Sequence, residues 1–148
     1  ACCSREGWSS APPRRGRRFI PRLPDHLNAE VVLGTVSNLR EACDWLSYTY
    51  LYIRMLRNPM KYGLDYEEKR KDPLLVERRE LLIRDAADKL RKSRMTRFDH
   101  AAHTFFMTDQ GRIGSHYYVS FESMETYNTL FKRHITPADL FHIVASSR

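Results

Sequence analysis

The sequence has little glycine, only three cysteines and no long apolar run among its 148 residues. Its six glycines form neither the G-x-x-x-x-G-K-[ST] phosphate loop nor the G-x-G-x-x-G turn. The chain therefore has no motif that could cradle ATP, and we expect no catalytic activity from it alone. No stretch of about 18 apolar residues could span a membrane. The start of the sequence also lacks the apolar segment of a secretory signal.

The cysteine and histidine positions argue against a disulfide framework and against a metal site. Cys2 and Cys3 are adjacent, and Cys43 lies on the apolar face of a predicted helix, so we expect a reducing, intracellular environment. A nucleophilic Cys43 would need a base beside it, and the predicted helix buries this side chain, which favours a buried structural thiol. His100-x-x-His103 is the one metal-like pair. We interpret it as a turn, because a structural zinc needs four ligands.

The net charge of +7 is concentrated in residues 1–22, where six arginines and one glutamate give five of the seven charges. This segment mixes arginine with Ser, Gly and Pro, and we predict a disordered basic tail. Its Pro-Pro-Arg-Arg-Gly-Arg-Arg run is typical of a nucleic-acid arm or a nuclear-import patch. We favour a merely solvated tail over both of these functions.

Residues 38–57 predict a central helix around which the others pack. Asn38 and Glu41 form a capping box at its start, and Asn58-Pro59 ends it. A helix with two apolar faces must be covered on two sides. The first face consists of Leu39, Cys43, Leu46, Tyr50 and Ile53, and the second of Trp45, Tyr48, Tyr52 and Met55.

Two more helices flank this segment. One is predicted to start at Pro24-Asp25, and another covers residues 73–94, with Asp72 as its N-cap and proline in its first turn. Residues 59–72 between them are expected to be a polar connection. The predicted core stripe of the later helix consists of Leu74, Leu75, Leu81, Leu82, Ala86 and Leu90.

After residue 94 the hydrophobic period changes from 3.6 to 2. Residues 96–99 and 104–107 predict two strands of a hairpin. Later helices are expected from Thr108, from Ser120 or Ser123, and from Thr136. Three helices followed by a two-stranded hairpin wing define a mainly α winged helix, a variant of the helix-turn-helix.

Candidate binding residues fall into two groups. Helix 73–94 carries acidic as well as basic outward residues, and acidic side chains repel phosphates, so this helix fits a nucleic-acid groove badly. The tyrosines at 117 and 118 could stack on a base or pack at a domain seam, and we favour packing. The nucleic-acid candidates are Arg14, Arg15, Arg17, Arg18, Lys89, Arg91 and Lys92. The candidates for an interdomain seam are Arg54, Arg57, Tyr117 and Tyr118.

From Phe19 to about Ser147 the chain resembles one segment of the two-cassette DExH-box helicases. The matching stretches are 23–36 (Leu-Pro-Asp-His-Leu-Asn-Ala-Glu-Val-Val-Leu-Gly-Thr-Val), 48–55, 58–63, 72–75, 111–118 (Gly-Arg-Ile-Gly-Ser-His-Tyr-Tyr) and 125–128. The family includes the helicase subunit of the activating signal cointegrator complex, which 92–99 and 124–134 resemble more closely. The spliceosomal snRNP helicase is a near sibling, and residues 54–57 and 72–75 are more similar to it.

This resemblance implies a winged-helix domain over residues 23–119 and the start of a helical ratchet domain over 120–148. It implies a non-catalytic segment that braces the second RecA-like motor domain against the ratchet domain during ATP-dependent unwinding of RNA or DNA. ATP and Mg would then be bound by the motor domains of the parent helicase. A free-standing winged helix that binds nucleic acid through its arginine-rich tail is the alternative.

The resemblance also implies partners and a location. The partners would be the motor and ratchet domains of the same chain, RNA or DNA held by the parent, and subunits of the cointegrator complex or the spliceosome. The expected location is the nucleus, with the cytoplasm as a second site.

Overall fold

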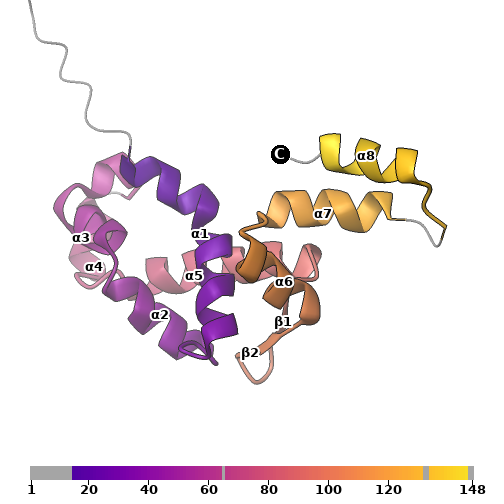
Figure 1. Ribbon diagram of the computed structural model, residues 1–148. Coiled ribbons are helices and arrows are strands. Elements are labelled where there is room, and N and C mark those ends of the chain that lie inside the picture. Colours follow the sequence, from indigo (N-terminus) through magenta and orange to yellow (C-terminus); the bar gives the residue numbers. More distant parts are fainter. Residues whose placement is uncertain (1–14, 65, 132–133, 147–148) are drawn as a thin grey trace, which may run out of the picture.

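The computed structural model describes residues 15–64, 66–131 and 134–146. This part of the chain is mainly helical, with eight α-helices, one short 3-10 helix and one two-stranded antiparallel sheet (Figure 1). The predicted winged helix followed by further helices is confirmed. The elements in order are α1 (Arg15–Leu33), α2 (Leu39–Ser47), α3 (Tyr50–Arg57), η1 (Pro59–Tyr62), α4 (Tyr66–Lys71), α5 (Val76–Lys92), β1 (Thr96–Asp99), β2 (Thr104–Met107), α6 (Asp109–Tyr117), α7 (Phe121–Leu130) and α8 (Pro137–Ala145).

Helix α1 lies at the centre of the molecule, where it packs against α3, α5, α6 and β2. Its Leu23, Leu27 and Val31 are buried one turn apart, so the central helix is α1 and not the predicted segment 38–57. The predicted start at Pro24-Asp25 is also wrong, because α1 runs through Pro21 and Pro24. Burial of its apolar face outweighs the backbone hydrogen bonds that two prolines remove.

The predicted basic tail falls partly inside this helix. Residues 15–22 belong to α1, so the expected disorder is wrong for them. Residues 1–14 lie outside the described residues. Phe19 and Ile20 explain the difference, because both pack against the core from the N-terminal part of the helix.

The predicted helix 38–57 is divided into α2 and α3 at Tyr48-Thr49. The Ser47 hydroxyl donates to the Asp44 carbonyl at 2.6 Å, and the Thr49 hydroxyl donates to the Leu46 carbonyl at 2.7 Å. Thr49 has an extended backbone as the N-cap of α3. Short polar side chains that bond nearby carbonyls compete with helix continuation.

The break changes which side chains face the core. Both predicted apolar faces are wrong in part, because Tyr48, Tyr50 and Ile53 are exposed. The helix start is as predicted, since the Asn38 side chain accepts a hydrogen bond from the Glu41 amide at 2.8 Å. The predicted core positions that are buried are Leu39, Leu46, Tyr52 and Met55.

Helix α5 begins at Val76, three residues after the predicted first residue. Leu75 adopts the left-handed conformation before it, and the Asp72 carboxylate accepts from the Glu77 amide at 2.9 Å. This start turns Leu74 and Leu81 outward, against the prediction. The buried face consists of Leu75, Leu82, Ile83, Ala86, Ala87 and Leu90. The segment before α5, predicted as a polar connection, contains η1 and α4.

The wing has the predicted strand bounds. Phe98 and Phe105 are cross-strand partners whose buried rings lie 4.7 Å apart. A third short segment extends this sheet, because the Leu39 amide donates to the His103 carbonyl and the Phe105 amide donates to the Ser37 carbonyl, both at 2.8 Å. The sequence did not indicate this addition, which joins the wing to the start of α2.

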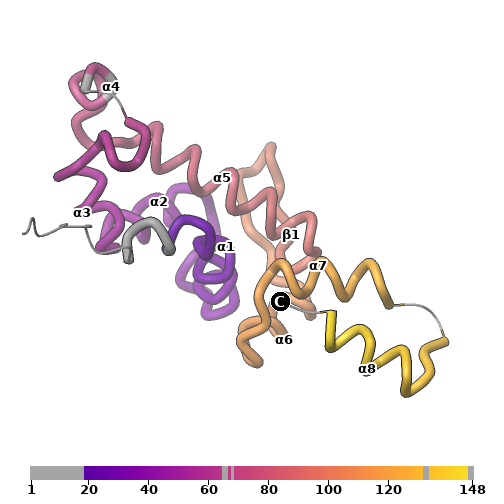
Figure 2. The backbone as a smooth tube through the Cα atoms, turned by 90° about the horizontal axis from the view of Figure 1, so that it is seen from above, coloured from indigo at the N-terminus to yellow at the C-terminus, as the bar shows by residue number. Residues whose placement is uncertain are grey.

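The last three helices begin at predicted caps, Thr108, Ser120 and Thr136. Helices α7 and α8 form an antiparallel pair at one end of the molecule, and α3 and α4 lie at the other end (Figure 2). Among the described residues, no helix has both the length and the apolar character needed to cross a bilayer.

Two leucines of α1 test this assignment of the core. Leu27 is fully buried and Leu33 is 72% exposed on the same helix. We expect Leu27→Ala to lower the free energy of unfolding by about 2–5 kcal/mol, and Leu33→Ala to change it by less than about 0.5 kcal/mol. Urea denaturation followed by circular dichroism measures both. Equal effects would show that α1 is not the centre of the core.

Candidate interdomain interface

A single buried amide joins three elements of the fold. Asn28 on α1 is 1% exposed, and its Nδ2 donates to the Gly111 carbonyl of α6 at 2.9 Å. Its Oδ1 accepts from the Thr96 hydroxyl of β1 at 3.1 Å. A buried polar group that lost these partners would be strongly unfavourable. Asn28 therefore fixes α6 relative to α1 and the wing.

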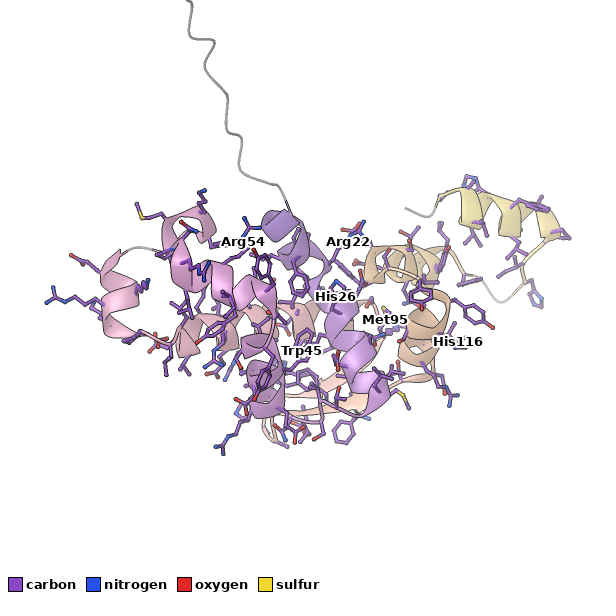
Figure 3. The ribbon with its side chains drawn as sticks, turned by 60° about the vertical axis from the view of Figure 1, so that its left-hand side comes forward. Arg22, His26, Trp45, Arg54, Met95 and His116 are labelled. Carbon is purple, nitrogen blue, oxygen red and sulfur yellow. The ribbon has the colours of Figure 1, made fainter. Side chains whose placement is uncertain are left out.

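The two glycines of α6, Gly111 and Gly114, allow this helix to lie close to Met95 and to Asn28 of α1. A Cβ at Gly111 would lie 2.0 Å from the Met95 carbonyl oxygen and 2.8 Å from the Asn28 Oδ1. A Cβ at Gly114 would lie 2.5 Å from the Met95 Cε. Figure 3 shows Met95 between α1 and the elements that follow the wing. The glycines are required for packing here, not for turns.

Helix α7 is tied to the winged helix at both ends. At its start, the Phe121 amide donates to the Asp25 Oδ1 of α1 at 2.8 Å. Toward its end, the Asn128 Nδ2 donates to the Ser93 carbonyl after α5 at 2.7 Å. The Gln110 side chain of α6 donates to the Asn128 Oδ1 at 2.9 Å. These bonds and the Asn28 amide form a joint that holds α6 and α7 against α1, β1 and the end of α5.

None of the residues in this joint was among the predicted site residues. The available signal was an asparagine at position 28, within the apolar pattern of Leu27 and Val31, together with the Gly-x-x-Gly spacing at 111–114. The partners are far away in sequence, since Asn28 and Gly111 are 83 positions apart, so no local pattern could pair them.

The predicted seam residues lie in two separate places. Arg54 and Arg57 belong to α3, and the Arg54 guanidinium lies 5.6 Å from the centre of the Tyr50 ring. Tyr117 and Tyr118 end α6, with Tyr118 95% exposed in a left-handed conformation at φ 57°. Helix α1 separates these two groups (Figure 1). They therefore do not form one continuous surface.

The predicted nucleic-acid residues of α5 are largely neutralised by neighbouring carboxylates. Lys89 lies 2.8 Å from Asp85, and Arg91 lies 3.6 Å from Asp88. Lys92 is exposed beside a cleft of about 350 Å³ that α7 lines with two glutamates. Arg14 lies outside the described residues, as do the side chains of Arg15, Arg17 and Arg18.

The described residues contain no cluster of three or more His, Cys, Asp or Glu that could hold a metal. Gly34 follows α1 and Gly63 follows η1, each with a positive φ, and Gly111 and Gly114 lie inside α6. Cys43 is half-buried, and burial raises the pKa of its thiol.

Comparison with known families agrees with this architecture. Residues 17–92 match the winged helix-turn-helix domain family, and residues 107–148 match the Sec63 Brl domain family. The fold and these matches define a winged-helix domain joined to helices of a Sec63-type domain.

Similar proteins identify the larger family. The chain is 49% identical over 130 residues to the DExH-box ATP-dependent RNA helicase DExH14 of Arabidopsis thaliana. It is 50% identical over 131 residues to activating signal cointegrator 1 complex subunit 3 of Dictyostelium discoideum, and 48% identical over 130 residues to the U5 small nuclear ribonucleoprotein 200 kDa helicase of Drosophila melanogaster. Each match covers 88% of this chain and 6% of the relative. The chain belongs to the winged-helix segment of the DExH-box helicase family, which confirms the resemblance.

The Asp25 carboxylate in the joint gives a pH test. Burial raises its pKa above the ordinary 3.8, although the Phe121 amide and the nearby His26 and Arg22 act in the opposite direction. The folded state therefore binds this proton more tightly than the unfolded state. Its contribution to stability is greatest below the unfolded pKa and is lost as pH rises through the folded pKa. We expect Asp25→Asn to become progressively more favourable relative to wild type as pH rises from the unfolded pKa through the raised folded pKa.

Asp99 in the wing turn is a control, because its pKa is shifted in the opposite direction to that of Asp25. Hydrogen bonds from the Ala101 and Ala102 amides lower the pKa of its carboxyl. Its contribution is present above the unfolded pKa and is lost as pH falls, so Asp99→Asn should cost stability near neutral pH and cost less in acid. Urea denaturation over a pH series measures both variants. Parallel pH profiles for the two variants would contradict this assignment.

Proposed function

We propose that this chain is a non-catalytic winged-helix segment that braces the second RecA-like motor domain of a DExH-box helicase against its ratchet domain. In this proposal, residues 23–119 form the winged-helix domain and residues 120–148 begin the ratchet domain. ATP and Mg act in the motor domains of the parent chain, not in this segment.

The observation that carries the proposal is the amount of exposed apolar surface at both ends of the molecule. Eighteen large hydrophobic side chains of the described residues are exposed. One group lies on α3 and η1, and another lies on and around α8, at Phe131, Ile135, Leu140, Phe141 and Val144. Contiguous exposed apolar patches mark interaction surfaces. Two such surfaces at opposite ends suit a segment that contacts a different neighbour with each end.

The alternative, direct nucleic-acid binding by a free-standing winged helix, has less support. Insertion of α5 into a groove would bring Glu77, Asp85 and Asp88 toward phosphates, and Lys89 and Arg91 already have acidic partners. The proposed wider setting follows from the relatives. It is a nuclear helicase, with the cytoplasm as a second location, whose partners are cointegrator-complex or spliceosomal subunits and whose substrate is RNA or DNA.

The brace can be tested by combining Tyr117→Ala with Tyr118→Ala in the full-length helicase. These exposed tyrosines end α6 and would lose their contacts with a neighbouring domain, which weakens coupling between the motor and the ratchet. We expect ATP hydrolysis to continue while the unwinding rate falls about tenfold, within the usual 1–3 kcal/mol of coupling between sites. Tyr48→Ala, an equally exposed tyrosine outside the proposed seam, is the matched control. Unchanged unwinding in the double variant would rule out this part of the seam.

A further inference from the structure

We draw no further inference here: the strongest candidate, the cleft of about 560 Å³ beside Cys43 where the start of α2, the first turns of α5 and the wing turn meet, carries nothing, because arginines and carboxylates line it together and nothing in the structure shows what would fill it.

Discussion

The buried amide of Asn28 is the constraint on which the rest of this structure depends. A polar side chain in the core must find partners for its donor and its acceptor, and a displaced helix would leave both unpaired. Asn28 meets this requirement only when β1 presents Thr96 and α6 presents the carbonyl of Gly111. One side chain of α1 thus fixes the positions of both the wing and α6. Hydrogen bonds of Asp25 and Asn128 hold α7 to the same body. The helices after the wing therefore pack with the preceding elements as one unit.

The distribution of charge gives this unit a character unlike that of a DNA-reading winged helix. The helix that would enter a groove pairs Arg84, Lys89 and Arg91 with carboxylates on its own surface, which lowers its attraction for phosphates. Exposed apolar side chains gather elsewhere, on α3 and η1 and around α8. The packed joint in the middle and the exposed apolar side chains at the ends are the observations that support the proposed brace.

The sequence predicts those features that local signals determine. The hairpin follows from a period of two, and the starts of α6, α7 and α8 follow from Thr108, Ser120 and Thr136 as N-caps. The family could also be predicted, because its motifs are long and keep their order. The early helices were predicted less well, because packing lets α1 continue through Pro21 and Pro24, and hydroxyl groups at Ser47 and Thr49 interrupt an otherwise helical pattern. The joint could not be predicted at all, since its bonds connect residues that only the fold brings together.

Native-state hydrogen exchange of the 148-residue chain tests the central claim, that the joint makes α1 and α6 one cooperative unit. The amide of Arg112 in α6, which donates to the Thr108 carbonyl, can be compared with amides around Leu27 in α1. If the buried Asn28 couples the two helices, these amides exchange with the same free energy of opening and respond equally to added denaturant. Exchange of Arg112 at a much lower free energy than α1 would show that α6 opens on its own, and would contradict the account.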